Sequence, residues 1–188
     1  MKTLILNGST RKNGDTAALL NEFTKHLHGD VMMLSHEDNI SPCRDCRYCW
    51  KNSGCSIQDK MQEVYAFLEE CDHVVIASPV WFSSLTGPLL NIASRMQTLF
   101  AARFFRGETT EADKNGVIFL VGAEPGTQEM PEKAALTILK QMHVRRPCVA
   151  TVYCMNTDKV PACRDKTALQ QAREAAYLLN KLCEKPQK

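Results

Sequence analysis

Five short apolar segments alternate with helical segments along this chain, and the alternation constrains the fold more than any other feature. The apolar segments occupy residues 2–6, 31–34, 73–77, 116–121 and 148–153, and residues 74–77 read Val-Val-Ile-Ala, which is typical of a strand buried on both faces. Apolar residues at helical spacing follow from about residues 15, 59, 88, 131 and 167. Strands interleaved with helices in this way form a parallel sheet with helices on both faces.

The length of the chain and its pattern favour one domain over residues 1–188. A domain of 188 residues buries roughly 70% of its unfolded surface, and no shift in composition calls for a second core. We therefore expect a three-layer α/β/α, flavodoxin-like fold whose five-stranded parallel sheet has the order 2-1-3-4-5. In such sheets ligands bind beyond the carboxyl ends of the strands, which brings together the loops at residues 8–16, 78–84 and 122–126.

The first of these loops has the composition of a phosphate site. Gly8 permits a sharp turn after the strand, Ser9 and Thr16 carry hydroxyl donors, and Arg11 carries a charged fork of donors. The helix that follows points free N–H groups toward the same place. The glycine spacing is one residue too long for a Walker loop, and no cysteine nucleophile is present. A turn that only caps the helix is the alternative.

The second loop offers a surface for a planar ring. Pro79 forces Ser78 into an extended conformation, and the N–H groups that follow are expected to be free for ring acceptors. Trp81 and Phe82 are expected to supply an apolar wall. Two ordinary core aromatics at the end of a strand are the alternative.

These two loops carry a family resemblance. Residues 8–16 resemble the G-S-x-R-x-x-G-[ND]-T motif, and residues 78–89 the S-P-V-[YW]-[FW]-x-x-x-x-G-P-L motif, of the NADPH-dependent FMN reductase family, including its iron-sulfur flavoprotein branch. The resemblance covers at least residues 1–100. One departure is the sequence P-L-L-N-I-A-S-R at residues 88–95, which lacks the Lys and the Asp of the family pattern.

The resemblance implies a binding role for particular residues. It assigns the FMN phosphate to Ser9, Arg11, Asn13 and Thr16, and we expect Asp15 to contribute a backbone N–H or a cap, because its carboxylate repels phosphate. It assigns the isoalloxazine ring to Pro79, Val80, Trp81, Phe82, Ser83, Ser84, Gly122, Ala123 and Glu124.

Four of the nine cysteines fall within thirteen residues, in the segment 41–56. Cys43, Cys46, Cys49 and Cys55 have the spacing C-x2-C-x2-C-x5-C, which is closer to iron-sulfur ligation than to paired zinc knuckles. The iron-sulfur flavoproteins carry the same compact pattern, which implies a [4Fe-4S] cluster. An empty cysteine loop, as in related reductases, is an equal alternative, and zinc or a redox dithiol are lesser ones.

Composition limits the partners. A net charge of +2 and a pI near 8.1 do not fit an obligate nucleic-acid binder, and no apolar run is long enough to span a membrane. We expect a cytoplasmic protein, because only five residues separate Lys2 from Gly8, too few for a signal peptide. The segment from Pro88 to about residue 100 is apolar nearly all round, which predicts one helix buried on both sides in a homodimer or a dimer of dimers.

The residues favour an FMN-dependent NAD(P)H oxidoreductase that reduces flavin, quinone or another small-molecule acceptor. An FMN electron carrier between protein partners, possibly with a cluster, is the alternative, and a metal-binding interaction module is a third. No protein acid or base is needed for hydride transfer to a flavin, so no catalytic residue is assigned. Arg103 and Arg106 are able to reach the extra phosphate of NADPH, but a solvated or dimer-contact role is favoured for both.

Overall fold

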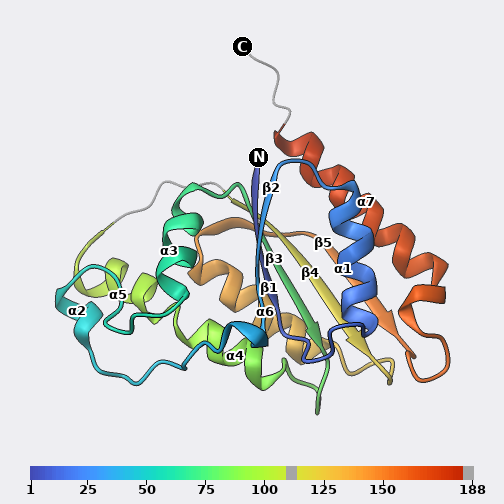
Figure 1. Ribbon diagram of the computed structural model, residues 1–188, viewed down its shortest axis with the longest axis horizontal. Helices are drawn as coiled ribbons and strands as arrows, with labels where there is room; N and C mark the ends of the chain where they lie inside the picture. The colour runs from blue at the N-terminus through green and yellow to red at the C-terminus, as the bar shows by residue number, and fades with distance from the viewer. Residues whose placement is uncertain (109–113, 184–188) are drawn as a thin grey trace.

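The computed structural model describes residues 1–108 and 114–183, with the backbone alone at residues 145–147. Its centre is a five-stranded sheet in the order β2-β1-β3-β4-β5, and every neighbouring pair is parallel (Figure 1). This confirms the predicted flavodoxin-like order. The strands are β1 (Lys2–Asn7), β2 (Asp30–Leu34), β3 (His73–Pro79), β4 (Lys114–Gly122) and β5 (Val144–Met155).

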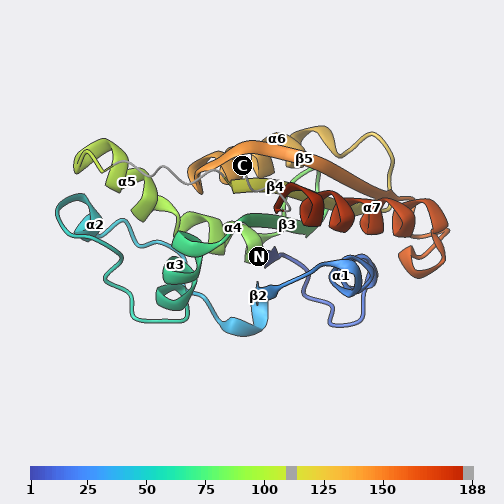
Figure 2. The same ribbon diagram turned by 90° about the horizontal axis from the view of Figure 1, so that it is seen from above.

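Helices cover both faces of the sheet. The α-helices are α1 (Asp15–His26), α2 (Tyr48–Lys51), α3 (Met61–Glu70), α4 (Gly87–Ser94), α5 (Gln97–Phe105), α6 (Glu129–Gln141) and α7 (Lys166–Cys183), and the 3-10 turns are η1 (His36–Asp38) and η2 (Ala162–Arg164). Two of them, α2 and α5, lie side by side at one end of the molecule, away from the sheet (Figure 2). No helix in the described residues is long and apolar enough to cross a membrane.

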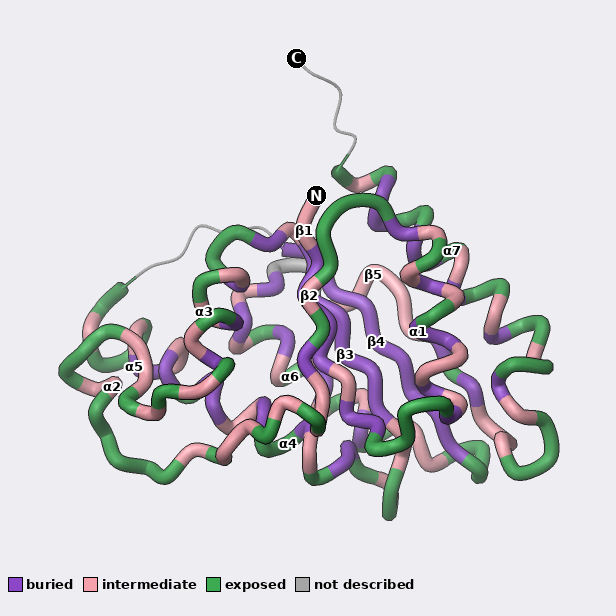
Figure 3. Tube along the Cα trace, in the orientation of Figure 1, coloured by how far each residue is buried: buried purple, intermediate pink, exposed green. Residues whose placement is uncertain are grey.

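The alternation of side chains along the strands builds two separate cores. In β1, Leu4 and Leu6 face the layer formed by α3, α4 and α6, whereas Ile5 faces the layer of α1 and α7. Phe23 of α1 packs edge-on against Phe119 of β4, with ring centroids 5.3 Å apart. The central strands β1, β3 and β4 are buried along most of their length, whereas exposed residues lie on the helices and in the loops (Figure 3).

The segment from Pro88 to about residue 100 is two helices, which corrects the prediction of one. The carbonyl of Arg95 accepts the Tyr65 hydroxyl at 3.0 Å, and the N–H groups of Arg95 and Met96 bond three residues back, to Ile92 and Ala93. The regular helical ladder is therefore interrupted between α4 and α5. Leu90 is 42% exposed, so α4 is not buried on both sides within one chain.

Other boundaries also differ from the sequence prediction. Strands β4 and β5 extend past both predicted ends, to Lys114–Gly122 and Val144–Met155. The polar, charged sequence at residues 101–115, which is typical of a connection between a helix and a strand, begins within α5, which continues to Phe105, and ends within β4. Residues 109–113 of that connection lie outside the described residues.

Candidate functional site

The loop after β1 lies against the amino-terminal end of α4. Thr86 Oγ1 donates to the Gly8 carbonyl at 2.7 Å, and the Gly8 N–H donates to the Ala77 carbonyl at 2.8 Å. A Cβ at Gly8 would lie 2.6 Å from Thr86 Oγ1 and 2.8 Å from Leu89 Cβ. Gly8 is therefore required by this close approach rather than by a special turn. The loop is held in place by β3 and α4, two elements that sequence reasoning had linked only to the flavin ring.

The hydroxyls predicted to hold phosphate lie inward at the start of α1. Ser9 is 5% exposed and Thr16 is 2% exposed. The Ser9 hydroxyl contacts both the Arg11 N–H and the Arg11 carbonyl, while His36 Nδ1 lies 3.1 Å from the Ser9 carbonyl. Gly14 caps α1 without a side-chain bond, and the first N–H groups of α1 have no acceptor among the described residues. This end of α1 offers several donors and a favourable dipole to an anion.

The carboxylate of Asp15 contacts η2 and Arg11. Its Oδ1 accepts the Ala162 N–H at 2.8 Å, which caps η2, and its Oδ2 lies 3.8 Å from Arg11 Nη1. The carboxylate thus ties the loop to the connection between β5 and α7, and it caps η2 rather than α1, the helix that Asp15 begins. Arg11 has an exposed side chain, and Asn13 lies on the exposed surface of the same loop.

The loop after β3 folds into a tight hairpin. The N–H of Trp81 donates to the Ser84 carbonyl at 3.0 Å, and the N–H of Ser84 donates back to Trp81 at 2.9 Å. Phe82 and Ser83 form the turn with φ of 51° and 53°, which is the left-handed region that such a turn requires. Neither residue is a glycine, so the turn costs roughly 1–2 kcal/mol per residue. Strain of this kind is concentrated at functional sites.

The hairpin leaves fewer free N–H groups than the sequence indicated. Val80 donates to the Val121 carbonyl at 2.7 Å, and Trp81 and Ser84 donate to each other, so the prediction that these three are free is wrong. Of the N–H groups at residues 80–84, only those of Phe82 and Ser83 have no acceptor among the described residues. Trp81 is half-exposed and Phe82 is fully exposed, so neither is an ordinary core aromatic.

The third loop is placed beside the second. Gly122 ends β4, and a Cβ there would lie 2.8 Å from Met155 Cε and 3.3 Å from Val80 Cβ. Ala123 and Glu124 are exposed, and the Glu124 carbonyl accepts the Thr127 hydroxyl at 2.8 Å. The three loops predicted to share one site therefore leave the sheet at adjacent strand ends, β1, β3 and β4 (Figure 1).

The four clustered cysteines line one pocket at the other end of α4. Cys43, Cys49 and Cys55 are half-buried and Cys46 is exposed, and the cations Arg44, Arg47 and Arg95 share the lining. Burial raises the pKa of the Cys49 thiol, and the neighbouring thiols raise it further. The hydroxyl of Ser56, 3.3 Å from Cys46 Sγ, and the Tyr48 N–H lower the pKa of Cys46.

The pocket does not have the geometry of a site for one ion. Within residues 1–108 and 114–183, no three side chains of the His, Cys, Asp or Glu types close on a single metal ion. Zinc ligands lie 2.0–2.3 Å from one centre, an arrangement that these thiols do not make within the described residues. The four thiols line one shared space.

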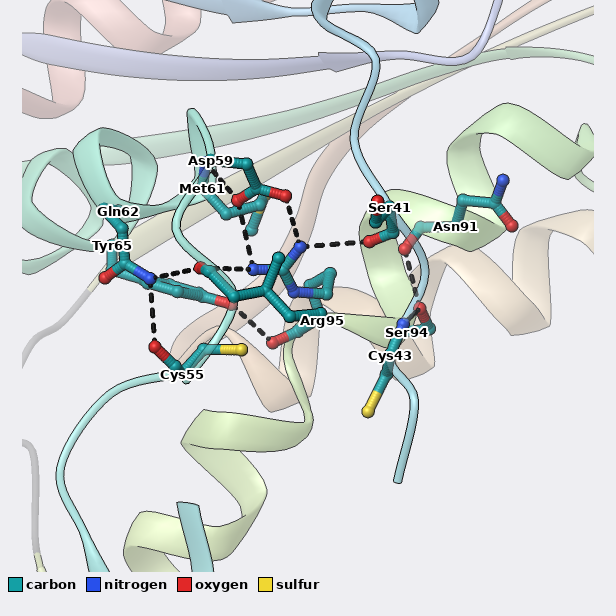
Figure 4. A network of polar contacts seen from close by, with 11 residues as sticks. Ser41, Cys43, Cys55, Asp59, Met61, Gln62, Tyr65, Asn91, Ser94 and Arg95 are labelled. Carbon is teal, nitrogen blue, oxygen red and sulfur yellow. Dashed lines mark hydrogen bonds and ion pairs between the residues drawn. The ribbon is translucent and has the colours of Figure 1, made fainter. Parts of the chain in front are cut away.

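Side chains outside the cysteine segment hold it in place (Figure 4). The Cys43 N–H donates to Ser94 Oγ at 2.9 Å, and Gln62 Nε2 donates to the Cys55 carbonyl at 3.1 Å. Arg106 donates to the Cys49 carbonyl and also pairs with Glu108. Arg106 is therefore engaged by the cysteine segment, which corrects its expected role as a solvated or dimer-contact side chain.

Arg95 closes the cysteine segment at both ends. Its side chain is fully buried, and its guanidinium donates to the carbonyls of Ser41 at 3.0 Å and Ile57 at 3.4 Å. Asp59 accepts two further bonds at 2.6 and 3.1 Å. Burial opposes the charge on Arg95, but the bonds to Asp59 outweigh it and hold the pKa of Arg95 above its ordinary value. In the sequence, Arg95 was noted only as the last residue of the segment 88–95, and its contacts with the cysteine segment were not predicted.

One short helix connects the two candidate sites. At its amino-terminal end, Thr86 holds the loop at Gly8, and at its carboxyl-terminal end Ser94 and Arg95 hold the cysteine segment. Eight residues of α-helix span about 12 Å. The loop at residues 8–16 and the thiol pocket are therefore fixed to opposite ends of α4.

Comparison with known proteins identifies the fold and its loops. Residues 1–160 match the family model described as NADPH-dependent FMN reductase. The chain belongs to the NADPH-dependent FMN reductase family. This family membership supports an FMN-dependent oxidoreductase, and it confirms the resemblance seen in residues 8–16 and 78–89.

Curated relatives of this family member are named iron-sulfur flavoproteins. A protein of that name from Methanosarcina thermophila is 26% identical over 194 residues, which cover 98% of this chain and 94% of that protein. Another, from Archaeoglobus fulgidus, is 36% identical over 101 residues, and that match spans 52% of this chain and about half (49%) of the relative. The chain that carries the cysteine pocket is thus similar to proteins that are named iron-sulfur flavoproteins.

Solved structures agree on the fold. An NAD(P)H:quinone oxidoreductase from Methanothermobacter marburgensis has a TM-score of 0.73 at 16% identity, covering 96% of this chain and 97% of that chain. An FMN-dependent NADH-azoreductase from Bacillus anthracis, solved in complex with FMN, has a TM-score of 0.61 at 13% identity, covering 95% and 99%. At these identities the likeness is one of fold alone.

Proposed function

We propose that this family member is an NAD(P)H oxidoreductase that binds FMN at the carboxyl ends of β1, β3 and β4 and passes electrons to a small-molecule acceptor. The observation that carries the proposal is the pairing of a donor-rich loop at residues 8–16 with the strained hairpin at residues 81–84 on neighbouring strands. One loop has the chemistry for a phosphate, and the other presents free N–H groups to a planar ring. The bound flavin supplies hydride and electron transfer.

Different residues hold the phosphate and the ring of FMN in this proposal. Ser9, Thr16 and the first N–H groups of α1 bind the phosphate, and the exposed charge of Arg11 adds to its attraction. The N–H groups of Phe82 and Ser83 donate to the ring edge. The exposed Trp81 side chain covers the ring, while residues 122–124 border it.

Turnover with a nicotinamide nucleotide tests this proposal. The purified protein, loaded with FMN, is expected to oxidise NADH or NADPH in the presence of free flavin or a quinone. Oxidation in the absence of any acceptor serves as the blank. Tight FMN binding without turnover of either nucleotide would reject the enzyme and leave a flavin electron carrier.

The cysteine pocket fits a [4Fe-4S] cluster, which we propose as a second redox group. Four thiols and three arginines line the space, and two buried donors in its wall, Arg95 Nε and Trp50 Nε1, have no acceptor among the described residues. Thiolates ligate such clusters, and N–H donors around the sulfur atoms are part of their environment. Bound there, such a cluster would supply single-electron transfer, and Cys43, Cys46, Cys49 and Cys55 would hold it.

An electron carrier between proteins is the second candidate function. It is favoured by the exposure of Cys46 and of Phe104 and Phe105, which place the thiol pocket beside an apolar surface on α5. We also propose a homodimer or a dimer of dimers that uses the exposed apolar residues of α4 and α5. Sedimentation of the FMN-loaded protein as a monomer would reject the oligomer.

A further inference from the structure

Two hydrogen-bond donors in the wall of the cysteine pocket are buried without a partner. Arg95 Nε and Trp50 Nε1 are both shielded from solvent, and neither has an acceptor among the described residues. Both side chains line the space shared by Cys43, Cys46 and Cys49. An unsatisfied buried donor costs about 1–3 kcal/mol and is rare in folded proteins. Two of them in one pocket indicate an acceptor that the pocket is built to receive.

The contacts of the Arg95 side chain leave one of its N–H donors without an acceptor among the described residues. A guanidinium carries five N–H donors. Four contacts engage Nη1 and Nη2, with Ser41, Ile57 and both oxygens of Asp59 as the acceptors. These contacts fix the plane of the guanidinium, so Nε cannot turn to find another protein acceptor. In Figure 4 the thiols of Cys43 and Cys55 lie on either side of this side chain.

The indole of Trp50 is fixed by contacts on its faces. Its ring stacks on Phe105, with centroids 4.3 Å apart and an angle of 21° between the planes. The Arg47 guanidinium lies 4.8 Å from the centre of the indole ring. The nitrogen of an indole can only donate a hydrogen bond. Trp50 follows Cys49 directly in the sequence, and its side chain lines the pocket.

We propose that Trp50 Nε1–H and Arg95 Nε–H donate to the sulfur atoms of the group that the four cysteines hold, and that they raise its reduction potential. This inference rests on the proposed cluster. Sulfur atoms that carry negative charge are the acceptors that a thiolate-lined pocket offers to N–H donors. Each electron added to the cluster increases that charge, so the donors stabilise the reduced form more than the oxidised form. Hydrogen bonds to sulfur are an established means of setting cluster potentials.

The test uses Trp50→Phe and a matched control, Phe105→Leu. The first variant keeps an aromatic ring against Phe105 and removes the N–H together with part of the indole's volume. The second removes the stacked partner and keeps the N–H. Each protein is reconstituted anaerobically with iron and sulfide, and its midpoint potential is measured by titration monitored by electron paramagnetic resonance. Iron, sulfide and flavin contents are determined on the same samples.

Trp50→Phe is expected to have a lower midpoint potential than the wild type, by a roughly tenfold shift in the reduction equilibrium, or about 59 mV for one electron. Phe105→Leu is expected to stay near the wild-type value. The reduced wild-type cluster, prepared in D2O, is expected to show a deuteron coupling that Trp50→Phe lacks. The coupling in the wild-type protein alone shows that an exchangeable N–H faces the cluster, and its loss in Trp50→Phe assigns that N–H to Trp50.

The results that would reject the two hydrogen-bond donors differ from those that would reject the proposed cluster. Equal midpoint potentials in Trp50→Phe and the wild type, or no exchangeable deuteron coupled to the wild-type cluster, would overturn the donors and leave the cluster intact. A wild-type protein that takes up FMN but no iron or sulfide would overturn the cluster and the donors with it, while the flavin site would stand.

Discussion

The two ends of α4 carry sites made in different ways. At the proposed flavin end, backbone groups form much of the candidate site: the first turn of α1, the hairpin at residues 81–84, and a glycine that lets two elements touch. At the cysteine end, side chains from α3, α4 and α5 fix a segment that has little regular structure of its own. A backbone site depends on local conformation, whereas a segment held by side chains depends on distant partners. Substitutions should therefore damage one site and spare the other.

Removing Arg95 is expected to have the largest effect. Arg95→Met leaves Asp59 without its partner and releases Ser41 and Ile57, which costs about 3 kcal/mol of unfolding free energy. The pocket thiols should react faster with a disulfide reagent, while FMN affinity changes little. Urea unfolding, thiol kinetics and FMN titration measure the three quantities.

The exposed arginine Arg103 offers a matched control, because Arg103→Met removes a cation from α5 without opening the cysteine segment. The double variant Arg95→Met with Asp59→Leu should recover part of the lost stability, since no unpaired carboxylate remains. A loss of FMN binding as large as the loss of stability would show that the two ends of α4 are not separable.

Gly8→Ala is the corresponding test of the flavin end. The added Cβ would meet Thr86 Oγ1 at 2.6 Å and Leu89 Cβ at 2.8 Å, so α4 or the loop has to move. We expect a cost of about 1–3 kcal/mol and weaker FMN binding, with unchanged thiol reactivity. Gly87→Ala is the control, because a Cβ there meets nothing within 4 Å. Equal FMN affinity in both variants would contradict the close approach as a requirement of the site.

Ser83→Gly is expected to stabilise the protein. Ser83 has a φ of 53°, which glycine adopts without strain, so the variant should gain about 1 kcal/mol of unfolding free energy. FMN affinity should be kept, because the backbone N–H of residue 83 is retained. Thermal unfolding with and without FMN measures both effects. A clear loss of affinity would assign the flavin contact to the hydroxyl instead.

Asp15→Asn should have the smallest effect. The amide oxygen of Asn still accepts the Ala162 N–H, and a negative charge near the phosphate is removed. Stability is expected to stay within about 0.5 kcal/mol, and FMN affinity to stay equal or improve. Asp15→Ala, which deletes the acceptor, is the comparison. A marked loss of FMN affinity in Asp15→Asn would mean that the carboxylate itself takes part in binding.

The flavin end was readable from the sequence because its chemistry follows from local order. Gly8, Ser9 and Thr16 lie within nine residues after a recognisable strand, and the 2-1-3-4-5 order of the sheet places the three loops together. What the sequence did not reveal there is the hairpin, because Phe82 and Ser83 are not the residues that usually favour a left-handed turn.

At the cysteine end, only the spacing of the four cysteines could be recognised from the sequence. Arg95 lies 36 residues from Asp59 and 54 from Ser41, and no local pattern connects positions so far apart. The break between α4 and α5 was missed for the same reason, because the Arg95 carbonyl bonds Tyr65 on another helix. The apolar run at residues 88–100 shows only that these residues favour a helix.

The absorbance spectrum of anaerobically purified protein, with flavin, iron and sulfide counted per chain, tests the central claim most directly. Two sites at the ends of α4 predict one FMN per chain together with about four irons and four sulfides, and a broad cluster band beneath the flavin bands. A protein that binds neither flavin nor iron after reconstitution would contradict the account. Flavin without iron would contradict its cysteine half.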